Sequence, residues 1–127
     1  MQIHESAENY LETILILKKR NGQVRSIDIA VELSFSKPSV SVAMKNLRTN
    51  GYIAMDKDGY ITLLDKGLQI AETIYERHTF LSDWLASLGV GPKGATEDAC
   101  RIEHVISAET FEAMKSHGNR VSNKEGE

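Results

Sequence analysis

Two Asn-Gly pairs, at positions 21–22 and 50–51, limit how the first half of this 127-residue chain can fold, because such pairs end helices and form turns. Ahead of the first pair, apolar residues recur at helical spacing over residues 7–20. Between the two pairs the pattern predicts a short helix over 26–33 and a longer one over 37–49. The first half is therefore expected to hold three helices in succession.

The second and third predicted helices have distinct signals. In the second, we expect Ile27, Ala30 and Val31 to turn inward. The third has a strong start signal, because Ser36 can cap the helix and Pro38 is tolerated in its first turn.

Two short β-like runs follow, at 52–55 and 60–63, and the polar loop between them ends in Gly59. A polar loop of this kind between such runs is typical of a hairpin. Three helices and a hairpin make a winged helix-turn-helix, which we assign to residues 1–64.

The second predicted domain, residues 65–127, is helical. A long apolar stripe opens it, a further helix is expected over 96–106 with Thr96 as its cap, and a last one over 108–116. We expect the polar tail after about residue 117 to be disordered. The predicted fold class is thus mainly α with a small β-hairpin.

Charge is distributed unevenly between the two halves. The net charge of −3 does not by itself favour nucleic acid. However, residues 13–50 hold seven basic and two acidic side chains, whereas residues 64–127 hold seven basic and eleven acidic ones. This asymmetry is typical of a DNA-contacting part joined to a part with another role.

Membrane insertion and secretion are not expected. Neither a bilayer-spanning apolar stretch nor a signal-peptide pattern is present in the sequence. The single cysteine excludes an internal disulfide and fits the reducing cytoplasm.

The third predicted helix has a face that suits the major groove of double-stranded DNA. A recognition helix reads base edges with a few side chains, while neighbouring residues hold phosphates. The predicted DNA-binding residues are Arg25, Lys37, Ser39, Ser41, Val42, Lys45 and Arg48.

The run from Ala99 to His104 carries a second kind of chemistry. On a helix, Cys100, Glu103 and His104 stand at positions i, i+3 and i+4, so that a thiol, a carboxylate and an imidazole share one face. These are three types of metal ligand. The first hypothesis is therefore a transcription regulator that responds to a metal ion.

Two further residues bear on this hypothesis. His78 occupies a core position of the long apolar stripe, where an imidazole needs a partner, and a ligand-bearing helix nearby favours metal binding. Glu12, by sequence alone, is interpreted as a solvated acid facing Lys18 or Lys19.

Five motifs carry a family resemblance over roughly residues 5–117. They are Glu8-Asn9-Tyr10-Leu11-Glu12, Val24-Arg25-Ser26-Ile27-Asp28-Ile29-Ala30, Pro38-Ser39-Val40-Ser41, Arg77-His78 and Ala99-Cys100-Arg101-Ile102-Glu103-His104-Val105. Together they resemble the iron- and manganese-dependent transcriptional repressors, the diphtheria toxin repressor and manganese transport regulator type.

This resemblance implies an N-terminal winged helix, a helical dimerisation domain and metal bound between them, in a short two-domain member. It also implies ligands. Cys100, Glu103 and His104 match ligands of iron-type members, whereas Glu12 and His78 match ligands of manganese-type members.

Asn9 departs from the family pattern, which usually has Met or Asp there, and it would offer a carbonyl oxygen without charge or sulfur. The resemblance implies Fe²⁺ or Mn²⁺, whereas Cys and His unaided suggest Zn²⁺, with Co²⁺ a further ion able to bind in vitro.

The resulting expectation is a cytoplasmic, homodimeric repressor that is not an enzyme. A divalent metal would act as corepressor at a pseudopalindromic operator and control metal-uptake genes. Three alternatives remain open from the residues: a redox-responsive regulator using Cys100, a metal-independent DNA-binding relative, and a metallohydrolase, which the lack of an accompanying glycine motif disfavours.

Overall fold

The computed structural model describes residues 5–125, with side chains for residues 5–118, and is mainly helical with one hairpin. The elements in chain order are α1 (Glu5–Asn21), α2 (Ser26–Leu33), α3 (Lys37–Thr49), β1 (Ile53–Met55), β2 (Ile61–Leu63), α4 (Asp65–Ser87), α5 (Pro92–Ile102) and α6 (Ala108–Glu125). They confirm the predicted fold class.

The chain divides into two compact units, and the division falls inside α4, between Thr73 and Ile74. We refer to residues up to Thr73 as the winged-helix unit and to residues from Ile74 as the C-terminal unit. Among residues 5–125, no helix has both the length and the apolar character needed to cross a membrane.

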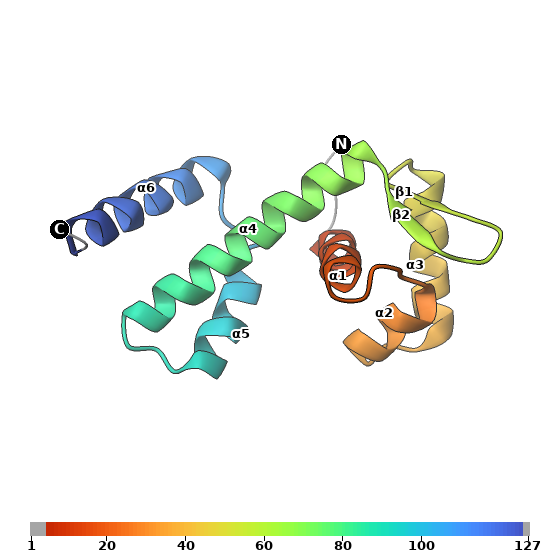
Figure 1. Ribbon diagram of the computed structural model, residues 1–127, viewed down its shortest axis with the longest axis horizontal. Coiled ribbons are helices and arrows are strands. Elements are labelled where there is room, and N and C mark those ends of the chain that lie inside the picture. The colour runs from red at the N-terminus through yellow and green to blue at the C-terminus, as the bar shows by residue number, and fades with distance from the viewer. Residues whose placement is uncertain (1–4, 126–127) are drawn as a thin grey trace. The chain divides into compact units, whose positions relative to one another are not determined.

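In the winged-helix unit, three helices precede an antiparallel hairpin (Figure 1). The hairpin register pairs Ile53 with Leu63 and Met55 with Ile61. The Ile61 N–H also donates to the Val24 carbonyl at 2.8 Å, which ties the hairpin to the segment before α2. The core side chains, contributed by every helix and strand of this unit, include Leu11, Ile14, Ile29, Val40, Met44, Leu47, Ile53 and Ile61.

The predicted inward face of α2 is right for Ala30 and wrong for two other residues. Ala30 is buried as expected, but Val31 is 73% exposed and Ile27 is 40% exposed, and Ile29 is buried instead. Apolar residues occur on nearly every side of this short helix, so periodicity alone did not identify the packed face.

Glycine is required where α4 meets the hairpin. A Cβ on Gly67 would lie at 3.0 Å from the Tyr52 carbonyl carbon and closer still to its oxygen. Lys66 next to it donates to the Asn50 carbonyl at 3.2 Å and lies over the Tyr52 ring at 4.2 Å. The first turn of α4 therefore packs directly on the backbone that leads into β1.

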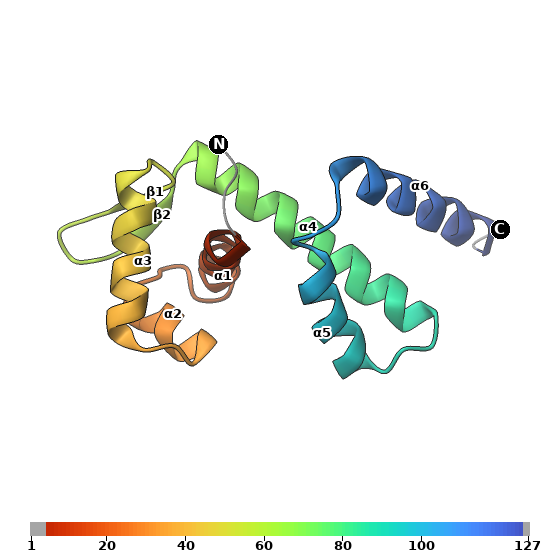
Figure 2. The same cartoon turned by 180° about the vertical axis from the view of Figure 1, so that it is seen from behind.

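The C-terminal unit is built from the rest of α4 with α5 and α6, and α6 lies beside α4 (Figure 2). Phe80 on α4 packs edge-on against Phe111 on α6, with ring centroids 5.6 Å apart. Lys115 on α6 pairs with Glu76 on α4. Ile74, Leu81 and other apolar side chains of this unit are buried.

Two predicted boundaries in this unit differ from the structure. The expected helix over 96–106 with a Thr96 cap instead begins at Pro92, after the N-cap Gly91, because proline fits the first turn of a helix. The segment after residue 117, expected to be disordered, continues α6 as far as Glu125. No proline interrupts that segment, and its polar composition is compatible with a helix.

Candidate metal centre and DNA-contacting helix

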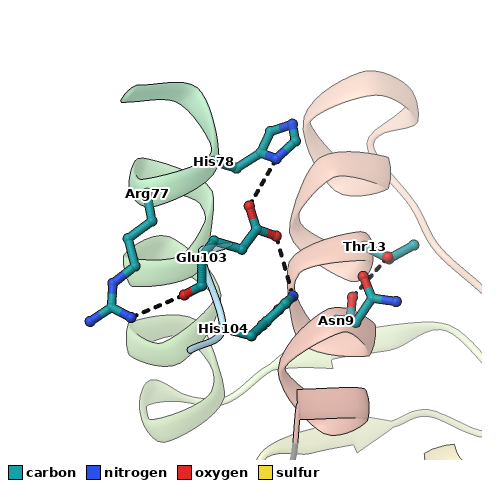
Figure 3. A network of polar contacts seen from close by, with 6 residues as sticks. All are labelled: Asn9, Thr13, Arg77, His78, Glu103 and His104. Atoms are coloured by element: carbon teal, nitrogen blue, oxygen red, sulfur yellow. Dashed lines mark hydrogen bonds and ion pairs between the residues drawn. The ribbon is translucent and has the colours of Figure 1, made fainter. Parts of the chain in front are cut away.

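A buried carboxylate stands between two imidazoles in the C-terminal unit (Figure 3). The Glu103 side chain is 0% exposed, with Oε2 at 2.8 Å from His78 Nδ1 and Oε1 at 3.3 Å from His104 Nε2. The His104 side chain is only 2% exposed. A buried carboxylate needs such partners, because leaving it without compensation in the interior costs several kcal/mol.

The chain forms this arrangement at the end of α5. The helix ends at Ile102, and Glu103 is its C-cap in a helical conformation, with its N–H donating to the Ala99 carbonyl at 2.9 Å. The Val105 N–H then donates to the Ile102 carbonyl at 3.0 Å, so helical spacing continues for another turn. The expected grouping of Cys100, Glu103 and His104 is therefore retained although the last two lie outside the helix proper.

The three side chains bring different donor atoms together. One ligand atom each from Cys100, Glu103 and His104 lies within 4.8 Å of the others. Cys100 is exposed, whereas the other two side chains are buried. A thiol, a carboxylate and an imidazole at such separations suit a divalent transition-metal ion, with solvent access on the thiol side. His78 adds a second imidazole from α4.

Arg77, whose role no local sequence pattern indicates, holds the backbone of this turn. Its Nη1 donates to the carbonyl oxygen of Glu103 at 3.0 Å (Figure 3). The same Nη1 donates to the carbonyl oxygen of Ile106 at 3.1 Å. The available sequence signal was its place immediately before His78.

The remaining predicted ligands belong to α1, in the winged-helix unit. Glu12 is 5% exposed, so its interpretation as a solvated acid is wrong. Asn9 is half-buried and its backbone carbonyl accepts the Thr13 hydroxyl at 2.8 Å (Figure 3). Asn9 and Glu12 are three residues apart, so they stand on one face of α1.

The exposed face of α3 carries the predicted DNA-contacting residues. Val40, Met44 and Leu47 are buried, and the helix starts as expected, with Ser36 Oγ accepting the Ser39 N–H at 3.3 Å. The predicted residues that are exposed on or beside this helix are Arg25, Lys37, Ser39, Ser41, Val42, Lys45 and Arg48. Val42 is 60% exposed, an apolar side chain on an otherwise polar surface.

Arg25 connects this surface to the hairpin. It is the N-cap residue of α2, and Asp28 Oδ2 accepts its N–H at 2.9 Å. Its guanidinium lies 4.4 Å from the centroid of the Tyr60 ring. Tyr60, which no local sequence pattern marks as functional, therefore helps to orient one of the predicted phosphate contacts.

A winged helix with a basic exposed helix, followed by a helical unit with clustered metal ligands, defines a metal-responsive DNA-binding regulator. Residues 2–61 match the iron dependent repressor N-terminal DNA binding domain, and residues 64–124 match the iron dependent repressor metal binding and dimerisation domain. The chain belongs to the iron-dependent repressor family, whose members are transcriptional regulators and not enzymes.

Individual relatives agree with this assignment. The transcriptional regulator MntR of Escherichia coli O157:H7 is 35% identical over 111 residues, covering 87% of this chain and 72% of MntR. The uncharacterized HTH-type transcriptional regulator MJ0568 of Methanocaldococcus jannaschii is 32% identical over 122 residues, covering 94% of this chain and 98% of that protein.

Solved structures show the same fold. The structure of the manganese regulator SloR matches with a TM-score of 0.78 and 28% identity, covering 94% of this chain and 55% of SloR. The chain thus spans about half the length of that relative. A manganese-dependent transcriptional repressor solved with manganese has a TM-score of 0.79 at 23% identity, which supports the fold alone.

Proposed function

We propose that this chain is a metal-dependent DNA-binding transcriptional repressor that uses Fe²⁺ or Mn²⁺ as corepressor to control metal-uptake genes. The observation that carries the proposal is the fully buried Glu103 carboxylate, which two imidazoles contact beside an exposed thiol. Matches to a DNA-binding domain and to a metal-binding and dimerisation domain support it. A protein of this kind acts where the DNA is, so we place it in the cytoplasm.

The donor set fits a divalent transition metal. Cys100, Glu103, His104 and His78 would hold the ion from the C-terminal unit. The thiolate favours Fe²⁺, Co²⁺ or Zn²⁺, whereas carboxylate oxygens favour Mn²⁺. The iron-dependent family description supports Fe²⁺, and the name of the manganese regulator SloR supports Mn²⁺. A ScaR structure with bound Zn²⁺ supports binding of other ions in vitro.

We further propose that α1 supplies two oxygen ligands, from Glu12 and Asn9. The support is the burial of Glu12 and the match of this position to ligands of manganese-type family members. Asn9 would bind the ion through its side-chain carbonyl oxygen, because the amide NH₂ group has no lone pair to offer. This ligand brings neither charge nor sulfur.

Ligands from both units would couple metal binding to DNA binding. A bound divalent ion would supply positive charge that compensates the acidic ligands of both units at once. Glu12 belongs to α1, which contributes side chains to the core of the winged-helix unit. A metal ion bound to Glu12 would therefore restrict the movement of the whole unit, including α3. This stabilises one arrangement of the protein over others, and by linkage DNA must then tighten metal binding by the same factor.

On the DNA side, α3 would enter the major groove. Val42 would touch a thymine methyl, and Ser39 and Ser41 would bond bases or phosphates, while Lys45 and Arg48 would meet phosphates. Lys37 and Arg25 would add positive charge near the phosphate backbone of the DNA. Because a homodimer presents two such helices related by a two-fold axis, the operator should be pseudopalindromic.

The test is binding of the purified protein to its own upstream DNA, first with chelator and then with Mn²⁺, Fe²⁺ or Zn²⁺ added in turn. We expect tight binding only with metal, and the rank of the ions would show how Cys100 and Asn9 tune the centre. Equal binding with chelator would contradict metal dependence.

A matched pair of variants tests the centre itself. Glu103→Gln keeps the shape but removes the charge, so metal affinity should fall by at least about 100-fold, about 2.7 kcal/mol. Glu97→Gln makes the same change on an exposed position of α5 and should leave metal affinity unaltered. Unchanged metal affinity in Glu103→Gln would contradict the assignment.

A further inference from the structure

Two consecutive residues of α4 hold Glu103 at both of its ends. His78 Nδ1 contacts the carboxylate at 2.8 Å, and Nη1 of the preceding Arg77 donates to the backbone carbonyl of the same residue at 3.0 Å (Figure 3). The same Nη1 also donates to the Ile106 carbonyl at 3.1 Å, on the other side of the turn. Arg77 therefore spans the turn that carries Glu103 and His104.

The carbonyls that Arg77 binds are of a kind that needs a donor. At the C-terminus of a helix the last carbonyl groups have no intrahelical N–H partner, and a cation there is favoured by the helix dipole. Glu103 is the C-cap of α5, so its carbonyl falls in this class. Fixing that peptide group restricts the direction in which the side chain leaves the backbone.

The surroundings of Arg77 indicate that its guanidinium is held where it can donate to the Glu103 and Ile106 carbonyls. The guanidinium lies 5.6 Å from the Phe111 ring on α6, and its Nε is buried without a hydrogen-bond partner among the residues that the structure describes. Arg101, in contrast, is 76% exposed and pairs with Asp98 within its own helix. Of these two arginines near the cluster, only Arg77 connects α4 to the turn.

We propose that Arg77 is a positioning residue of the metal centre, one that orients Glu103 and His104 for the ion without touching it. The inference rests on the proposed function. Groups that orient metal ligands typically change metal affinity by about 10–100-fold when they are removed. Loss of Arg77 should therefore weaken binding and alter the ligand geometry although every ligand is still present.

The experiment is a titration of the chelator-treated full chain with Co²⁺, followed by absorption of the d–d bands and of the thiolate-to-cobalt band. Arg77→Met keeps an apolar stem without donors and should bind Co²⁺ about 10–100-fold more weakly, with shifted d–d bands. Arg77→Lys keeps the charge on a shorter stem, so its affinity should lie between those of Arg77→Met and the wild type. Arg101→Met, the matched control, should behave as the wild type does.

Circular dichroism of each variant in chelator separates folding from positioning. A folded Arg77→Met with wild-type cobalt affinity and spectrum would overturn the inference. If Arg77→Met does not fold, Arg77→Lys decides in the same way, because wild-type affinity and spectrum in that variant would overturn it. A wild-type chain that binds no Co²⁺ would overturn the proposed function as well. If DNA binding depends on metal but the Arg77 variants keep the wild-type cobalt affinity and spectrum, this inference alone would be overturned.

Discussion

Replacing Gly67 by alanine tests the close packing of α4 on the winged-helix unit. The added Cβ would lie inside 3.0 Å of the Tyr52 carbonyl oxygen, at 3.0 Å from its carbonyl carbon and at 3.4 Å from Leu11 Cδ2. The oxygen accepts the Leu64 N–H at 3.0 Å, so it cannot turn aside without weakening that bond. The clash is with backbone, which yields less easily than the end of a side chain.

The expected cost follows from three terms. Overpacking costs about 1–3 kcal/mol, and the weakened hydrogen bond about 1 kcal/mol more. Alanine recovers about 1 kcal/mol, because it is a better helix former than glycine. The net loss is about 2 kcal/mol, which lowers the unfolding temperature of a unit of this size by about 8–16 °C.

Thermal unfolding followed by circular dichroism, in chelator, measures this loss. Gly94→Ala on α5 is the matched control, because its Cβ would meet Val90 Cγ1 at an ordinary 3.5 Å. The control should be neutral or stabilising by up to about 1 kcal/mol. A Gly67→Ala chain that unfolds at or above the wild-type temperature would refute the close approach of α4 to Tyr52.

Other substitutions have smaller expected effects. Ser36→Ala removes the Oγ that accepts the Ser39 N–H, so urea unfolding should show a loss of about 1 kcal/mol, and no measurable loss would mean that water replaces the cap. Val31→Ala, at a position 73% exposed, should change stability by no more than about 0.5 kcal/mol, whereas a core residue would lose several-fold more. The hydrogen bond from Lys115 to Glu76, and then the charge of that carboxylate, raise the pKa of Lys115 above its ordinary 10.5. Any stability from this pair is therefore present below pH 10.5 and lost as the pH rises through the higher folded pKa. NMR titration should return the Lys115 pKa to its ordinary value in Glu76→Gln, and an unchanged pKa there would assign the shift to another cause.

Local signals predicted much of the winged-helix unit. The capping serine and the proline of α3 and the glycine-terminated loop of the hairpin act within a few residues of themselves, so their structural effects can be read from sequence. The packed face of α2 could not be predicted in this way, because its apolar residues offer several faces and only the surrounding core selects one. The burial of Glu12 was missed for the same reason, since an acidic side chain carries no local mark of its environment.

The sequence by itself determined which metal-ligand types stand together at the end of α5. Helical spacing brings Cys100, Glu103 and His104 onto one side, and that spacing is a local property of the backbone. Only the tertiary structure decided that His78 meets the Glu103 carboxylate and that Arg77 holds its carbonyl, across separations of 25 and 26 residues. Those contacts depend on how α4 packs against α5 and the turn that follows it. Such packing is chosen by the whole hydrophobic core of the unit and not by any short run of residues.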